Sequence, residues 1–193
     1  MDDIVKQALA RWPNVPHCTG WLRLDGRGHW RLRDEADQAQ GAPGTPVRHE
    51  ALNAFINRNY ESDASGQWFF QNGPQRVYVE LEYTPWIVRL MKATDGALKL
   101  TDHTGNAFDP VAAYADEQGG VLFTNASGHV ALLHDHDLDG FAEHATLDDN
   151  GESGVFHWRA ETDLPLQAIA RAEVPARFGF IQSPEHKEKA EKA

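Results

Sequence analysis

The chain has 193 residues, of which 29 are acidic and 18 basic, so its formal net charge at pH 7 is −11. A chain of this length can bury a sizeable core. Its single cysteine, Cys18, excludes an internal disulfide framework and an all-cysteine zinc site. The excess of acidic residues repels phosphate backbones and anionic lipid. We therefore expect neither nucleic acid nor a membrane as a partner.

The first residues are acidic and amphipathic rather than basic and then apolar, and no apolar run approaches the length of a membrane span. This pattern predicts a cytoplasmic protein. We expect Cys18 to be a buried or half-buried thiol with no part in catalysis, because nothing near it in the sequence would lower the pKa of a thiol.

The first 60 residues predict two helices and one hairpin. Apolar residues at helical spacing predict a short N-terminal helix that ends at Pro13. Residues 21–24 and 29–32 predict two strands joined by a turn. Residues 34–44 have no apolar periodicity and predict an exposed loop. Thr45 and Pro46 then precede an apolar stripe, which predicts a helix over residues 46–60.

Residues 66–90 carry the strongest strand signal in the chain. Apolar residues alternate with polar ones over residues 76–83, so one face of this strand is predicted to be core and the other to face water. Asn72 and Gly73 predict the turn of a hairpin with the preceding aromatic run. Pro74 cannot donate a backbone hydrogen bond on the returning strand, so we expect a slightly longer loop there.

After Lys92 the pattern starts again. Residues 98–105 echo 22–28, residues 138–141 echo 52–55, and residues 156–158 echo 68–70, in the same order. We therefore predict an α+β protein of two similar subdomains, each with a β-hairpin, one helix and an antiparallel sheet. The predicted divisions are an N-terminal helix and arm at 1–19, a first repeat at 20–95, a second repeat at 96–182 and a disordered tail at 183–193.

Fold-forming positions of the first predicted repeat carry a resemblance to known proteins. They are Gly28-x-Trp30, Gly44-x-Pro46-Val47-Arg48 with Ala51-Leu52-x-x-Phe55, Gly66-x-Trp68, and Pro74-x-x-Val77-x-Val79-Glu80 followed by Pro85-Trp86. With these residues the chain resembles the uncharacterised proteobacterial families classed as domains of unknown function, in particular the two-repeat type linked to signal transduction. The resemblance implies an α+β fold of two similar subdomains and supplies no catalytic residues. The chain departs from the pattern between Glu82 and Pro85, where extra residues occur.

The sharpest chemical signal is the segment HDHDLDG at residues 134–140. The residues that fit the first, third, fifth and sixth positions of a calcium loop are Asp135, Asp137, Asp139 and Gly140. The twelfth position is Thr146, where a bidentate Glu is expected, so calcium would bind weakly. In the alternative, Asp135 or Asp137 caps a helix that runs through His144.

The same segment offers a second kind of metal site. His134 and His136 would share one face of an extended segment, and both imidazoles could then ligate zinc. A third ligand would come from elsewhere in the chain. Calcium and zinc are thus the only cofactors that the sequence suggests.

One strand presents the other candidate site residues. Glu80 and Glu82 share a strand face, as a glycosidase would require, but Arg76 beside them favours a solvated set of charges. Tyr78 lies among these charges, as an interface anchor would. We take Tyr78, Trp86 and Arg76 as candidate binding residues, with burial of Tyr78 in the core as the alternative.

The sequence contains no nucleotide-binding glycine loop and no G-x-S-x-G elbow of a serine hydrolase. We therefore expect a non-enzymatic binding or regulatory module of the signalling type, with a protein or a small molecule as its partner. A metal-binding protein or metal-dependent enzyme that uses residues 134–139 is the alternative. A homodimer formed through an exposed sheet edge is a third.

Overall fold

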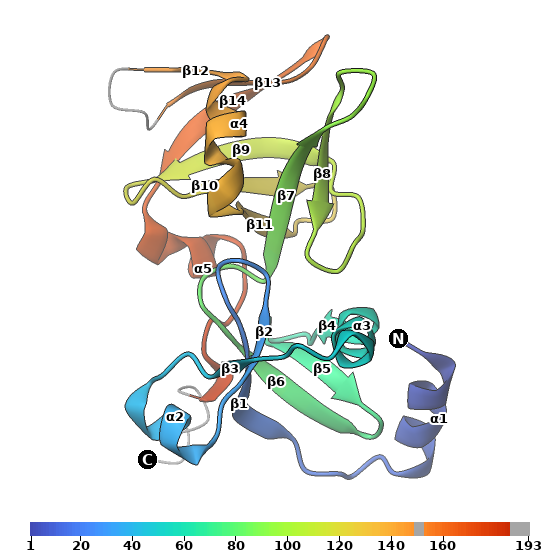
Figure 1. Cartoon of the computed structure of the whole chain (residues 1–193). Helices are drawn as coiled ribbons and strands as arrows, with labels where there is room; N and C mark the ends of the chain where they lie inside the picture. Colours follow the sequence, from blue (N-terminus) through green and yellow to red (C-terminus); the bar gives the residue numbers. More distant parts are fainter. Residues whose placement is uncertain (149–152, 186–193) are drawn as a thin grey trace. The chain divides into compact units, whose positions relative to one another are not determined.

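The computed structural model describes residues 1–148 and 153–185. They divide into two compact units. The first comprises Met1–Asp25, His29–Tyr83 and the described residues from Gly179 on, and the second comprises Gly26–Gly28 and Thr84–Phe178. Each unit is built on one β-sheet with short helices, so the fold is α+β, as predicted (Figure 1).

The described part of the first unit holds three helices and six strands. The helices are α1 (Asp3–Arg11), α2 (Glu35–Gln40) and α3 (Glu50–Arg58). The strands are β1 (Cys18–Leu24), β2 (Trp30–Leu32), β3 (Thr45–Pro46), β4 (Tyr60–Ser62), β5 (Trp68–Asn72) and β6 (Gln75–Leu81). They form a sheet in the order β3-β2-β1-β6-β5-β4. Its neighbours are antiparallel except for the central pair, β1 and β6, which is parallel.

The second unit holds a larger sheet. Its strands are β7 (Trp86–Lys92), β8 (Leu98–Asp102), β9 (Pro110–Asp116), β10 (Val121–Asn125), β11 (Val130–Leu133), β12 (Ala145–Leu147), β13 (Gly154–Arg159) and β14 (Thr162–Ile169). Its helices are α4 (Leu138–Ala142) and α5 (Val174–Arg177), each preceded by a short 3₁₀ helix, Asp135–Asp137 and Arg171–Glu173. The strand order is β12-β13-β14-β9-β10-β11-β7-β8.

The two sheets share a strand order. Strands β9 to β14 of the second sheet correspond, one by one and in chain order, to strands β1 to β6 of the first. With this correspondence the six strands lie in the same spatial order in both sheets. The parallel pair falls at the same place, β1 with β6 and β9 with β14. Helices α3 and α4 also correspond, because they precede β4 and β12. Strands β7 and β8 are additional, so the predicted match of residues 98–105 to 22–28 lies outside this correspondence.

The division between the units also differs from the predicted repeats. It falls after Tyr83 rather than after residue 95. Strand β7 pairs with β8 and with β11, which ties it to the second sheet. The described residues from Gly179 to Glu185 belong to the first unit, although the sequence predicted a tail from residue 183. Residues 186–193 of that tail lie outside the described residues.

Residues 34–44, predicted as a loop, contain α2. The Asp34 carboxylate accepts a hydrogen bond from the Asp37 amide at 2.8 Å, and the Asp37 carboxylate accepts one from the Asp34 amide at 3.2 Å. This reciprocal capping box satisfies two amide groups that a helix start leaves unpaired. Gly41 ends the helix with a φ of 65°. Capping therefore supports a helix that has no buried residue.

Helix α3 begins at Glu50, four residues later than predicted from residue 46. Thr45 and Pro46 instead pair with β2 at the edge of the sheet, where a proline is tolerated. The ring of His49 then accepts a hydrogen bond from the Leu52 amide at 3.3 Å and caps the helix. An aromatic contact between α3 and β5 holds the helix on the sheet, with the rings of Phe55 and Phe70 5.4 Å apart.

The strands predicted over residues 66–90 are present as β5, β6 and β7. Asn72 pairs with Gln75, so the loop between β5 and β6 consists of Gly73 and Pro74. The prediction of a longer loop is therefore wrong. Each unit has its own aromatic core. That of the first unit includes Trp30, Tyr60, Trp68 and Phe70, and that of the second includes Phe123, Phe141, Phe156 and Trp158. No helix in the described part of the chain is long and apolar enough to cross a membrane.

Candidate functional site

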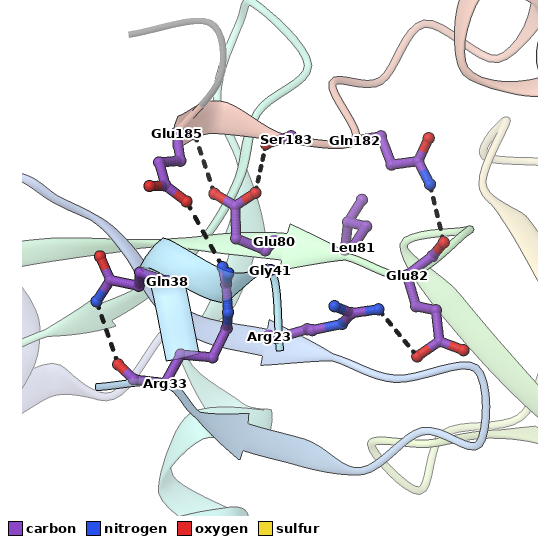
Figure 2. Close-up of a pocket in the computed structure, with 10 residues that line it drawn as sticks. All are labelled: Arg23, Arg33, Gln38, Gly41, Glu80, Leu81, Glu82, Gln182, Ser183 and Glu185. Atoms are coloured by element: carbon purple, nitrogen blue, oxygen red, sulfur yellow. Dashed lines mark hydrogen bonds and ion pairs between the residues drawn. The ribbon is translucent and has the colours of Figure 1, made fainter. Parts of the chain in front are cut away.

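A pocket of about 390 Å³ lies in the first unit (Figure 2). Four segments form it: β1, the segment from β2 to the end of α2, the end of β6, and residues 182–185. The residues that line it are Arg23, Arg33, Gln38, Gly41, Glu80, Leu81, Glu82, Gln182, Ser183 and Glu185. Its volume is typical of small-molecule sites, about 300–1,000 Å³. Its lining is mostly charged or polar, which suits a polar ligand.

Glu80 is the most informative residue of this pocket. It is only 7% exposed. The Ser183 hydroxyl donates to one carboxylate oxygen at 2.5 Å, and the Glu185 amide donates to the other at 2.9 Å. Both of these partners are neutral groups, and no cationic side chain among the described residues forms an ion pair with Glu80. A buried carboxylate in this condition is unfavourable for stability.

The sequence predicted that Glu80 faces water, and this is wrong. The segment from Ile181 to Glu185 covers that face of β6. The Leu81 amide donates to the Gln182 carbonyl at 2.9 Å, and the Gln182 side chain donates to the Glu82 carbonyl at 2.8 Å. Strand alternation tells which residues share a face, but it cannot show that a segment 100 residues later covers it.

Arg23 lies opposite Glu80 on the parallel strands β1 and β6. Figure 2 shows its guanidinium directed toward Glu82 rather than toward Glu80. Nη2 of Arg23 donates to the Glu82 carboxylate at 3.3 Å, and the side chain of Glu82 is 43% exposed. Nε of Arg23 is buried and finds no acceptor among the described residues. Arg23 therefore lines the pocket with one unused donor, which is enclosed, so that a ligand reaches it only when the side chain shifts.

Arg33 has a different role, because its donors are used by the backbone. Its Nε donates to the Ala42 carbonyl at 3.0 Å and its Nη1 to the Gly20 carbonyl at 3.3 Å. Its Nη1 also lies 3.6 Å from the Glu185 carboxylate, with both side chains less than 10% exposed. A Cβ at Gly20 would lie 2.8 Å from the Gln38 side-chain oxygen, so glycine leaves the room that this arrangement needs. Arg33 thus joins β1, α2 and the C-terminal segment.

The second candidate site contains part of the predicted metal segment. His134, Asp135 and His136 offer ligand atoms that all lie within 4.8 Å of one another. Burial, assisted by the positive charge of Arg89, lowers the pKa of His134 and favours its neutral, metal-binding form. The carboxylate of Asp135 is held by Arg27, whose Nη2 lies 2.6 Å away. A metal ion would have to compete with this arginine.

The structure separates Asp137 and Asp139 from this group. The Asp137 carboxylate accepts hydrogen bonds from Arg89 at 2.7 and 3.0 Å and from the Leu90 amide at 2.9 Å. Burial acts to raise the pKa of Asp137, but these hydrogen bonds outweigh it and lower the pKa. Asp139 is exposed in the first turn of α4. Asp137 precedes α4 without capping it through its side chain, and the His134 ring accepts from the His136 amide at 3.1 Å instead.

The candidate binding residues lie in different units. Tyr78 and Arg76 belong to the first unit and Trp86 to the second. Tyr78 is 8% exposed, and its hydroxyl donates to Asp63 at 3.1 Å. The Arg76 guanidinium lies 4.4 Å from the centre of the Phe69 ring. Trp86 is also buried. Tyr78 and Trp86 therefore contribute to the cores of their units.

A pocket of about 730 Å³ in the second unit brings together residues that the sequence did not single out. His157 Nδ1 lies 2.9 Å from the Asp163 carboxylate, and Nε2 lies 3.0 Å from the Thr146 hydroxyl. This sequence of contacts has the order of a nucleophile, base and orienting acid. However, the side chains of His157 and Asp163 are 49% and 60% exposed. Water screens such contacts, and we interpret them as cross-strand pairs on β12, β13 and β14.

The fold and the first pocket define an α+β protein of two related sheets with a small polar pocket. The family DUF2944, described as "Protein of unknown function (DUF2946)", matches residues 1–185, so the chain belongs to this family. No curated protein matches the chain. The predicted resemblance to families of unknown function is therefore confirmed.

Solved structures of DUF1285 family proteins are similar to this chain. The one from Silicibacter pomeroyi DSS-3 has 16% sequence identity and a TM-score of 0.52, and the match covers 88% of this chain and 97% of that chain. The one from Shewanella baltica OS155 has 13% identity and a TM-score of 0.43, covering 64% of this chain and 91% of that chain. At such identity the likeness to the Silicibacter protein shows the fold alone.

Proposed function

We propose that this protein is a non-enzymatic binding module that takes a small charged molecule in the pocket of its first unit. The observation that supports this most directly is Glu80, a buried carboxylate whose described partners are neutral. Burial of an uncompensated charge lowers stability, whereas a ligand of opposite charge would offset that loss. Such a residue in a pocket of ligand size marks a binding site.

The proposed module is regulatory and cytoplasmic, in keeping with the signalling type that the sequence resembles. The C-terminal segment supports a regulatory role, because Ser183 and Glu185 are hydrogen-bonded to Glu80 itself. A ligand that engages Glu80 changes the strength of these contacts and so changes how firmly residues 181–185 are held on the first unit. The partner of the module is then a protein that recognises the liganded state, or a second copy of the chain. The shared strand order further supports an origin by duplication of one unit.

Thermal unfolding of the full chain with a library of small charged metabolites tests the proposal. We expect at least one compound to raise the Tm of the wild type and of the control variant Glu50→Gln, because Glu50 is exposed in the same unit. The same compound should leave the Tm of the Glu80→Gln variant unchanged. The proposal is overturned when no compound raises the Tm of the wild type, or when every effective compound stabilises both variants equally.

Metal binding by His134, Asp135 and His136 is the second candidate function. It is favoured because each residue offers one ligand atom and these three atoms lie within 4.8 Å of one another. Two imidazoles and one carboxylate are common ligands of zinc, which would take a fourth ligand from water. Titration calorimetry with zinc alone tests this candidate. A site predicts binding that disappears in His136→Ala and persists in the control His49→Ala, which lies in the first unit. Equal heats for both variants would exclude the site.

A further inference from the structure

The pocket of the first unit presents opposite charges from neighbouring strands. Arg23 and Glu80 are register partners on β1 and β6, so their side chains leave the same face of the sheet. Adjacent strands are about 4.8 Å apart. No ion pair joins the two side chains among the described contacts, since Arg23 pairs with Glu82 and Glu80 with neutral donors. A positive and a negative side chain therefore line one pocket without an ion pair between them.

The two residues would bind ligand groups of opposite charge. Nε of Arg23 is a buried donor that lacks an acceptor among the described residues. Glu80 accepts two hydrogen bonds from neutral donors and has no ion-pair partner among the described residues. A carboxylate on a ligand would satisfy Arg23, and an ammonium group would compensate Glu80. One molecule with both groups satisfies both residues at once.

The rest of the lining restricts the ligand further. Leu81 is the one aliphatic residue among the described residues of the lining, so the pocket offers little apolar contact. The carboxylates of Glu80, Glu82 and Glu185 are not among the described groups close enough to hold a metal ion. An anion without a positive group would leave Glu80 without an ion-pair partner, and a cation without a negative group would leave Nε of Arg23 without an acceptor. A small zwitterion supplies a positive group for Glu80 and a negative group for Arg23.

Building on the proposed function, we propose that the ligand is a small zwitterion of the class of free amino acids. Its ammonium group binds Glu80 and its carboxylate binds Arg23. The amide side chains of Gln38 and Gln182 lie in the same lining and suit a polar ligand side chain. The volume of about 390 Å³ accommodates such a molecule with room for bound water.

Titration calorimetry of the full chain with each of the twenty common L-amino acids tests this assignment. For the amino acid that binds most tightly, the N-acetyl derivative removes the positive charge and the carboxamide derivative removes the negative charge. We expect each derivative to bind the wild type at least about tenfold more weakly. Because this comparison uses the wild type only, it remains decisive even where a pocket variant fails to fold.

The variants then assign each charge to its residue. The Glu80→Gln variant should bind the parent amino acid about tenfold or more weakly than the wild type does. Its affinity for the N-acetyl derivative should equal that of the wild type, because this derivative has no ammonium charge for Glu80 to bind. The Arg23→Gln variant should likewise bind the parent amino acid more weakly than the wild type does, and its affinity for the carboxamide derivative should equal that of the wild type. The controls Glu50→Gln and Arg48→Gln are exposed in the same unit and should bind like the wild type.

Three outcomes overturn the zwitterion proposal: no amino acid binds, the blocked derivatives bind as well as the parent, or Glu80→Gln weakens the N-acetyl derivative as much as the parent. The proposed function has a separate test. If no amino acid binds while another library compound raises the Tm in a Glu80-dependent way, the ligand class is wrong and the pocket remains a binding site. If no compound does so, both proposals fail.

Discussion

Arg23 and Glu80 face each other across the parallel strands β1 and β6, yet each side chain pairs elsewhere, Arg23 with Glu82 and Glu80 with Ser183 and the Glu185 amide. The C-terminal segment is responsible for this arrangement, because it supplies both neutral donors to Glu80. The same pocket therefore contains a buried carboxylate without an ion-pair partner and a guanidinium donor without an acceptor among the described residues.

Ser183→Ala removes one of the two donors to Glu80. We expect the free energy of unfolding to fall by about 1–3 kcal/mol, because a buried charged acceptor loses a hydrogen bond. The Glu185 amide should also exchange with deuterium faster, since its own bond to Glu80 is loosened. Ser127→Ala, at an exposed turn of the second unit, provides the control. Unchanged exchange at Glu185 would contradict the role of Ser183.

Gly66→Ala tests the close approach of the C-terminal segment to the sheet of the first unit. Gly66 has a φ of 79°, and an alanine Cβ would lie 2.2 Å from the Gly179 carbonyl oxygen. We expect a loss of about 3 kcal/mol or more in urea unfolding, from backbone strain and overpacking together. Gly73→Ala is the matched control: its φ is 57°, but its Cβ would meet no atom within 4 Å.

Strain alone predicts a loss of about 1–2 kcal/mol for Gly73→Ala. The difference between the two variants therefore measures the contact with Gly179. Equal losses for Gly66→Ala and Gly73→Ala would show that this contact is absent in solution.

His103 makes the stability of the second unit depend on pH. Burial lowers the pKa of His103 to about 3, against 6.5 for an unperturbed histidine. Between these values the unfolded chain binds more protons than the folded chain, so acid favours unfolding. The contribution is complete above pH 6.5 and is lost as the pH falls toward 3, by about 1.4 kcal/mol per pH unit.

Urea unfolding of the wild type and of His103→Asn at pH 8 and at pH 5 measures this effect. The difference at pH 8 reports the change in packing and in the hydrogen bond from the Ile87 amide, because the wild-type histidine is neutral there in both states. We expect the wild type to lose more stability than the variant on going to pH 5. A parallel loss in both proteins would mean that His103 is not buried in its neutral form.

Asp137 is expected to be a structural residue rather than a metal ligand. Its carboxylate accepts hydrogen bonds from Arg89 and from the Leu90 amide. Asp137→Ala should therefore lower the free energy of unfolding by about 2–3 kcal/mol. It should leave any zinc affinity unchanged. Asp139→Ala, at an exposed position of α4, should change stability by less than about 1 kcal/mol. A calcium loop would instead require both variants to reduce calcium binding.

The strands were predicted where apolar alternation was strong. Residues 66–90 form β5, β6 and β7 because their aromatic and β-branched residues pack on pleated surfaces. The start of α3 was misplaced because Thr45 and Pro46 resemble a helix start, while pairing with β2 decides their conformation. Helix α2 was missed because it lacks an apolar stripe. Its signal was present in the spacing of Asp34, Asp37 and Gly41.

The candidate site of the first unit could not be predicted from the sequence. Its charged residues lie at positions 23, 33, 80, 82 and 185, and only the folding of the chain brings them together. Glu80 has the alternation of a solvent-facing residue, and its burial depends on a segment about a hundred residues later. In contrast, His134, Asp135 and His136 are adjacent in sequence, so their proximity could be predicted.

The most direct test of the binding site is the NMR signal of the Arg23 Nε–Hε group. Its nitrogen is buried and has no acceptor among the described residues, so a bound carboxylate should shift this signal strongly. Arg23→Lys identifies the signal by its loss. On addition of a mixture of the twenty L-amino acids, the account predicts a saturable shift of the Arg23 signal, with the Arg58 and Arg89 signals unchanged. An Arg23 signal that does not move at saturating concentrations would contradict the account.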